Sequence, residues 1–105
     1  MRAIPPSLRI SKRYVAFSVD KKLHAREAGE LIDKLFKRWY GEVGMARADV
    51  RLVAEKFDGN SGVIAVALGH VQGLMFALSS SENPRFSTLG VSGMINKTKR
   101  FLNKD

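Results

Sequence analysis

The sequence has no cysteine, which excludes disulfide bonds and thiolate metal sites. Its two histidines, His24 and His70, lack the helical or hairpin spacing of paired metal ligands, so we expect no metal site in this chain. No apolar run approaches the length of a membrane span, and no signal-peptide pattern opens the sequence. We therefore expect a cytoplasmic protein without a membrane partner.

Acidic residues are few for a chain of 105 residues. Ten Asp and Glu stand against 18 Lys and Arg, which gives a formal net charge of +8 and an isoelectric point near 10.2. Such a charge on one small domain favours a polyanionic partner, with nucleic acid as the first candidate. The excess is concentrated at the two ends of the sequence, in Arg2, Arg9, Lys12 and Arg13 and in Lys97, Lys99, Arg100 and Lys104.

The first half of the chain reads as a strand followed by a helix. Alternating β-branched and aromatic residues predict a strand over 13–19. Apolar residues at helical spacing then predict a helix over 25–40, which Gly41 and Gly44 terminate. Acidic residues lead in this helix and basic residues follow, in agreement with the helix dipole.

The second half supplies three strands and two helices. Turn residues over 58–62 predict a hairpin between strands at 48–55 and 62–68. A helix over 70–79 and a strand over 85–89 follow, before a C-terminal helix.

This order of elements is the split βαβ pattern of ferredoxin-like and RNA-recognition domains. We expect an α+β fold, a ferredoxin-like βαββαβ sandwich with an N-terminal arm over 1–12 and an extra C-terminal helix. Residues 13–105, including that helix, are expected to form the single domain. The arm contains Pro5 and Pro6, which fix an extended backbone and cannot donate to a sheet.

The stretch from Leu89 to Leu102 combines a strand, a tight turn and a basic amphipathic helix. Ser92 is predicted to cap the helix, and Gly93 allows another backbone to come close. A helix start of this kind also suits a phosphate oxygen. Between the apolar positions Ile95, Thr98, Phe101 and Leu102 stand three cations on an expected solvated face, Lys97, Lys99 and Arg100.

An acylphosphatase-like enzyme acting on small phosphates is one alternative function. The stretch from Gly69 to Phe76 resembles the phosphate-cradle signature of that ferredoxin-like family. In the family an Arg follows the aromatic residue, whereas this chain has Ala77, and the loop precedes the first helix rather than the second. The charge-assisted contacts to a phosphate are therefore missing, and no catalytic triad has the required sequence context.

A stand-alone domain that binds single-stranded RNA is the other alternative. Such domains stack bases on aromatic residues of the first and third strands. Tyr14 is available, but the strand over 62–68 has no aromatic residue. The small residues Ala16, Ala65 and Ala67 instead predict that something packs over this face. Two candidates are a partner's helix and the C-terminal helix, through its apolar residues Ile95, Phe101 and Leu102.

Four motifs occur in order along nearly the whole chain: Pro5-Pro6-Ser7-Leu8-Arg9, Lys12-Arg13-Tyr14-Val15, Gly41-Glu42-Val43-Gly44 and Leu89-Gly90-Val91-Ser92-Gly93. Taken together they resemble archaeal ribonuclease P protein component 2. The opening motifs paired with the closing Leu-Gly-x-Ser-Gly are the specific part of the resemblance. One departure is Met94, where the family usually has Thr.

The resemblance implies a subunit of the ribonucleoprotein that removes the 5′ leader of precursor tRNA. In that family the RNA subunit hydrolyses the phosphodiester with Mg²⁺, so neither a cofactor nor a catalytic residue is expected in this chain. The implied partners are ribonuclease P RNA, protein component 3 in a heterotetramer of two copies each, and, indirectly, precursor tRNA. The candidate RNA-binding residues are Arg9, Lys12, Arg13, Ser92, Gly93, Lys97, Lys99 and Arg100.

Overall fold

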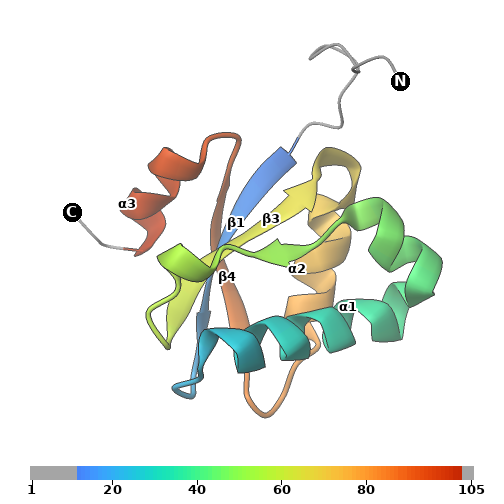
Figure 1. Ribbon diagram of the computed structural model, residues 1–105, viewed down its shortest axis with the longest axis horizontal. Helices are drawn as coiled ribbons and strands as arrows, with labels where there is room; N and C mark the ends of the chain where they lie inside the picture. The colour runs from blue at the N-terminus through green and yellow to red at the C-terminus, as the bar shows by residue number, and fades with distance from the viewer. Residues whose placement is uncertain (1–11, 103–105) are drawn as a thin grey trace.

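The computed structural model of the chain describes residues 12–102. Its elements are β1 (Lys12–Val19), α1 (Ala25–Ala48), β2 (Arg51–Leu52), β3 (Ser61–Ala67), α2 (Val71–Ser79), β4 (Phe86–Ser92) and α3 (Lys99–Leu102), with short 3₁₀ turns at Ala54–Lys56, Leu68–His70 and Ile95–Thr98. The strands form one antiparallel sheet in the order β2-β3-β1-β4. The structure is thus a mixed α/β fold with a four-stranded sheet, and the predicted order of elements is confirmed (Figure 1).

The main core lies between the sheet and the two longer helices. Alternate residues of β1 (Val15, Phe17 and Val19) are buried there, as the alternation predicts. They share one apolar cluster with residues of α1 and α2, including Ile32, Phe36, Leu74 and Leu78. The opposite face of β1 carries Ala16, which is also fully buried. Both faces of the central strand are therefore covered.

Helix α1 is interrupted, but not ended, at Gly41. The backbone there has φ 71° and ψ −176°, which glycine adopts without strain, so the predicted break is confirmed. The prediction that Gly44 also ends the helix is wrong, since helical structure resumes and runs to Ala48. Ala48 is fully buried and Met45 packs against the core, so burial stabilises this second segment.

The hairpin between β2 and β3 is confirmed, but β2 is much shorter than the predicted strand over 48–55. Only Arg51 and Leu52 pair with β3, opposite Ala65 and Ile64. Ala48, the first residue of the predicted strand, is the last residue of α1 instead. The end of the predicted strand belongs to the 3₁₀ turn Ala54–Lys56.

The C-terminal stretch differs most from its prediction. Strand β4 extends to Ser92 because its last residues pair with β1, with Ser92 opposite Tyr14. The prediction that Ser92 caps a helix is therefore wrong. Its hydroxyl accepts a hydrogen bond from the backbone N–H of Met94 (3.1 Å) and donates to the Met94 carbonyl (3.0 Å). Helical structure begins only at Ile95, as a 3₁₀ turn that continues into α3.

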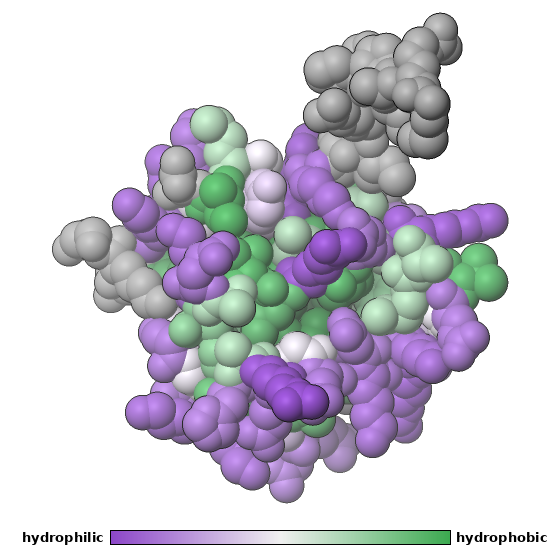
Figure 2. Space-filling model, viewed as in Figure 1, coloured by the Kyte–Doolittle hydropathy of each residue, from purple (hydrophilic) through white to green (hydrophobic). Residues whose placement is uncertain are grey.

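The C-terminal helix covers the sheet face opposite α1 and α2 (Figure 1). A Cβ atom at Gly90 would lie 2.4 Å from the ring of Phe101, so the ring sits directly on the backbone of β4. Thr98 is fully buried, and Gly90 pairs with Ala16. The C-terminal segment, which packs mainly on β1 and β4, is thus one of the two predicted candidates and lies over Ala16. Hydrophobic residues gather centrally, between α3 and β2, in the view of Figure 2.

Candidate nucleic-acid interface

Three of the predicted RNA-binding residues meet at the end of the sheet where β1 begins and β4 ends. Antiparallel pairing places Tyr14 opposite Ser92, so Arg13 lies close to the turn that follows β4. The Arg13 Nη1 atom is 3.5 Å from the position that a Cβ at Gly93 would occupy. Arg13 therefore lies beside the turn that leads into the second basic segment.

Three further candidates lie on the adjoining helical segment. Lys97, Lys99 and Arg100 are exposed, while Thr98 between them is buried against the sheet. The expected solvated face is confirmed. Within residues 12–102 the ion pairs join Lys12 to Asp49, Lys37 to Glu42 and Arg51 to Asp49, so none engages these three cations. They can contact phosphate oxygens without first losing a protein partner.

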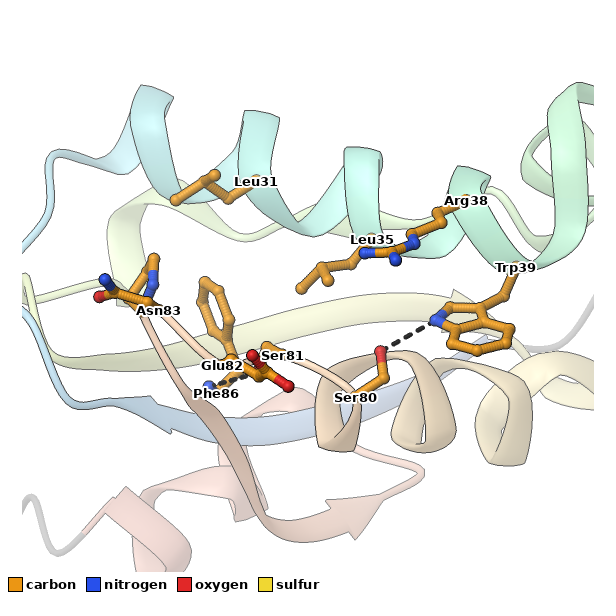
Figure 3. A pocket seen from close by; sticks show the side chains of 10 residues that line it. Leu31, Leu35, Arg38, Trp39, Ser80, Ser81, Glu82, Asn83 and Phe86 are labelled. Carbon is orange, nitrogen blue, oxygen red and sulfur yellow. Dashed lines mark hydrogen bonds between the residues drawn. The ribbon is translucent and has the colours of Figure 1, made fainter.

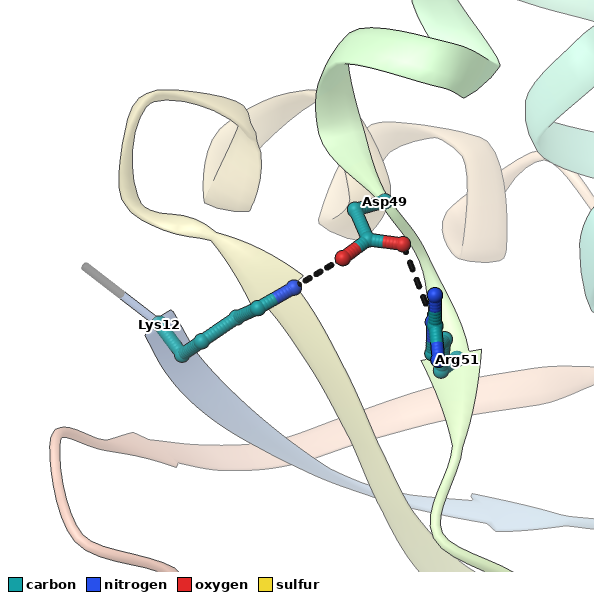
Figure 4. A network of polar contacts seen from close by, with 3 residues as sticks. All are labelled: Lys12, Asp49 and Arg51. Atoms are coloured by element: carbon teal, nitrogen blue, oxygen red, sulfur yellow. Dashed lines mark hydrogen bonds and ion pairs between the residues drawn. The ribbon is translucent and has the colours of Figure 1, made fainter. Parts of the chain in front are cut away.

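The side chain of Lys12 forms an ion pair within the protein and is not free for a phosphate. Its ammonium group forms an ion pair with Asp49, whose other carboxylate oxygen accepts a hydrogen bond from Arg51 Nε at 3.0 Å (Figure 4). The hydrogen bonds from Lys12 and Arg51 lower the pKa of Asp49 below its usual value. Lys12 should therefore bind a phosphate less strongly than an unpaired lysine would. Arg9, the remaining candidate, lies outside the described residues.

Asp49 was missed by the sequence analysis, although a local signal exists. It follows the last residue of α1 with φ 50°, in the left-handed region where Asp and Asn are enriched. Its backbone N–H donates to the carbonyl of Met45 at 3.0 Å and so closes the helix. An Asp directly after a helix is therefore a plausible cap, but its pairing with Lys12 depends on the fold.

One hollow is lined by residues of α1 and of the connection between α2 and β4. It has about 550 Å³ and separates α1 from the connection between α2 and β4 (Figure 3). Trp39 Nε1 donates to Ser80 Oγ across it at 2.9 Å, and the Ser81 hydroxyl accepts from the N–H of Phe86 at 2.8 Å. The first hydrogen bond joins α1 to the end of α2, and the second joins the residues after α2 to the start of β4. These polar groups therefore already have partners within the fold.

Comparisons with known proteins point to one family. No protein-family model matches the chain. It is 34% identical to ribonuclease P protein component 2 of Pyrococcus furiosus, over 94% of this chain and 88% of the relative. The protein of the same name from Archaeoglobus fulgidus is also 34% identical, over 95% of each chain. This chain belongs to the ribonuclease P protein component 2 family. The component 2 protein of Methanocaldococcus jannaschii is 34% identical too, over 97% of this chain and 81% of the relative.

The fold of this component 2 family member occurs in a solved structure. A chain in the cryo-EM structure of yeast ribonuclease MRP aligns with a TM-score of 0.66 and 14% sequence identity. The alignment covers 90% of this chain and 88% of that chain. At this identity the likeness establishes the fold alone.

The acylphosphatase alternative finds little support in the structure of this component 2 family member. Gly73 of the resembling stretch lies in α2, where a Cβ would be 3.2 Å from the ring of Tyr40. Ala77 stands where acylphosphatases have their Arg, and it is completely buried. A buried position on the core side of α2 cannot present a guanidinium group to a phosphate. The glycine and alanine are therefore explained by helix packing.

The stand-alone RNA-recognition alternative is also disfavoured in this component 2 family member. The sheet face that would stack bases carries Phe101 directly on Gly90 and buries Ala16 completely. Bases cannot reach this part of the sheet while α3 is in place. Within residues 12–102, no group of three His, Asp or Glu side chains is arranged to hold a metal ion, and no helix is long and apolar enough to cross a bilayer.

We expect the pairing of Lys12 with Asp49 to make stability depend on pH. Because the folded-state pKa of Asp49 is lowered, its contribution is present above its unfolded pKa and is lost as pH falls through the folded value. Asp49→Asn should therefore lower the free energy of unfolding near neutral pH by about 0.2–1 kcal/mol, since the pair is partly exposed. The difference should shrink below about pH 4. Urea unfolding of both proteins across this range measures it.

Asparagine is the matched replacement because it keeps the tolerance for positive φ that residue 49 needs. Asp49→Ala should lose additional stability at every pH from backbone strain. A difference between Asp49→Asn and the unaltered protein that stays constant down to pH 2 would show that the carboxylate charge is not the cause.

Proposed function

We propose that this chain is a non-catalytic protein subunit of ribonuclease P. It supports the catalytic RNA in the endonucleolytic removal of the 5′ leader from precursor tRNA. The observation that carries the proposal is the identity of 30–35% with archaeal component 2 proteins along nearly the entire chain. The net charge of +8 and the basic cluster at one end of the sheet agree with an RNA partner.

The RNA surface proposed here combines the turn after β4 with the exposed cations of the 3₁₀ turn Ile95–Thr98 and of α3. Arg13 and Gly93 lie next to each other, and Lys97, Lys99 and Arg100 follow on the helical segment. The cations neutralise phosphates of the ribonuclease P RNA, and the backbone at Gly93 lets a phosphate come close. Neither contact reads the RNA sequence. Ser92 is included because it is the last residue of β4, directly before that turn, although its hydroxyl is engaged with Met94.

The proposal assigns the chemistry to the RNA. Mg²⁺ is a cofactor of the RNA subunit, and precursor tRNA is met indirectly, through that RNA. The proposed location is the cytoplasm. The strand order β2-β3-β1-β4, with α1 and α2 together on one face, supports a ferredoxin-like arrangement, because a split βαβ unit produces this order.

Protein component 3 is the proposed protein partner, in a heterotetramer with two copies of each chain. Light scattering on a purified mixture tests this pairing directly. The expected mass is that of two 11.7 kDa chains plus two component 3 chains. Addition of ribonuclease P RNA should shift both proteins into one larger particle. If the two proteins elute separately and neither shifts with the RNA, the proposed assembly is wrong.

A further inference from the structure

A hollow of about 380 Å³ opens beside Arg13, where the starts of β1 and α2 meet the end of β4. It brings together segments that are distant in the sequence. Its lining contains one cation, one amide, a glycine and three aliphatic side chains: Arg13, Gln72, Gly69, Leu68, Val71 and Val91. Of these residues only Arg13 belongs to the phosphate contacts proposed above, and those contacts assign no occupant to the hollow itself.

The polar groups of the hollow are oriented and available. Arg13 Nη1 donates to the carbonyl of Lys12 at 3.0 Å, which fixes the guanidinium group, and this is its one hydrogen bond within residues 12–102. An arginine carries five N–H donors, so most of the fork remains free. Gln72 is exposed in the first turn of α2, and its amide has no hydrogen-bond partner among the described residues. The hollow therefore offers several donors and one amide acceptor.

The apolar part of the lining favours a flat ring over a phosphate group. Leu68 at the rim is 46% exposed, and Val71 and Val91 are half-buried. A Cβ at Gly69 would meet no atom within 4 Å, so this side of the hollow is open. A phosphate gains nothing from aliphatic neighbours, whereas a planar base buries its faces against them and hydrogen-bonds at its edges.

We propose that this hollow binds an unpaired guanine base of RNA, an inference that rests on the proposed RNA partner. The O6 and N7 atoms of guanine accept from the guanidinium fork of Arg13, the commonest specific arginine contact with a base. The N1–H and N2–H groups donate to the Gln72 amide oxygen. Because these donors belong to the pairing edge, only an unpaired guanine can make both contacts. Since Phe101 lies on Gly90 and blocks that part of the sheet, this hollow is the base site that we assign to this fold.

Titration of the ¹⁵N-labelled full chain with GMP, AMP and inorganic phosphate tests the proposal. GMP should shift the signals of the Gly69 amide, the Gln72 side chain and Arg13 Nε, and bind at least about fivefold more tightly than AMP. Gly69→Leu adds a bulky side chain to a residue that lines the hollow and removes no charge, so it should weaken GMP binding at least about tenfold. Ala46→Leu introduces the same side chain at an exposed position of α1 and should leave binding unchanged.

Each other outcome overturns the proposal. If inorganic phosphate alone reproduces the shifts, the hollow is a phosphate site, and if AMP binds as tightly as GMP, guanine recognition is wrong. Gln72→Ala, an exposed helical substitution that should fold normally, must reduce the preference for GMP even if Gly69→Leu unfolds the chain. If these tests fail while the chain still assembles with component 3 and RNA, the subunit function stands without this base contact.

Discussion

Substitution of Gly90 by Ala should destabilise the packing of the C-terminal helix on the sheet. The added Cβ would lie 2.4–2.6 Å from three ring atoms of Phe101, closer than real Cβ contacts, so the ring or the helix must move. Overpacking of this kind costs about 1–3 kcal/mol of the free energy of unfolding. Urea unfolding measures the loss, and limited proteolysis after Lys97, Lys99 or Arg100 reports whether the helix is released.

A double-mutant cycle separates this clash from a general effect of changing a strand glycine. Phe101→Ala removes the ring, so adding Gly90→Ala to that variant should cost much less than it does in the unaltered chain. Gly29→Ala is the control, because its Cβ would be 4.0 Å from Leu52 and an alanine in α1 should be neutral or stabilising. Equal costs of Gly90→Ala with and without the ring would contradict the proposed contact.

Charge reversal on the exposed side of the C-terminal segment should produce the largest loss of RNA affinity. In the triple variant Lys97→Glu, Lys99→Glu, Arg100→Glu, three proposed phosphate contacts are replaced by repulsion. Each lost contact should lower the slope of log affinity against log salt by about 0.7–0.9. We therefore expect the slope to fall by about 2–3 and the affinity at low salt to fall by about 100-fold or more. Filter binding at several salt concentrations measures both.

The matched control reverses three exposed cations of α1, with Lys34→Glu, Arg38→Glu and Arg47→Glu. This variant has the same net charge as the first, so both have the same long-range attraction to RNA. If Lys97, Lys99 and Arg100 are true contacts, the control should retain most of the salt slope. Equal losses in the two variants would mean that total charge, rather than this surface, determines binding. Unfolding curves should change little for the α3 variant, because its three positions are exposed.

The sequence was sufficient for the order of elements, because it depends on local patterns, and it indicated that something covers the sheet face while leaving two candidates open. The alternation of apolar residues along β1 and their helical spacing along α1 and α2 can be read from the sequence without knowing which segments lie nearby. The small side chain of Ala16 indicated a close neighbour on the outer face, and the apolar positions of the C-terminal helix supplied one. The observed contact between Gly90 and Phe101 confirms that inference.

The errors occurred where a distant segment decides the local structure. Whether β4 ends at Leu89 or Ser92 depends on its pairing with the start of β1, which no local pattern reveals. That pairing turned a predicted helix cap into a strand residue. In the same way, Lys12 seemed a free cation until the fold placed it beside Asp49.

The candidate site was predictable only in part. The concentration of charge at both ends of the sequence indicated the basic surface, and the exposed positions of Lys97, Lys99 and Arg100 follow from helical spacing. The hollow at Arg13 was not predictable, because Gln72 and Val91 reach it from separate elements. The hollow can be identified only from the three-dimensional structure.

Cleavage of precursor tRNA tests the central claim most directly. Ribonuclease P RNA, Mg²⁺ and component 3 are held constant, and the rate of 5′-leader removal is measured with and without this chain. The account predicts that cleavage at the mature 5′ end appears or rises sharply only when this chain is present, and that the α3 charge-reversal variant fails to support it at the same concentration. An unchanged rate on addition of the intact chain would contradict the proposed function.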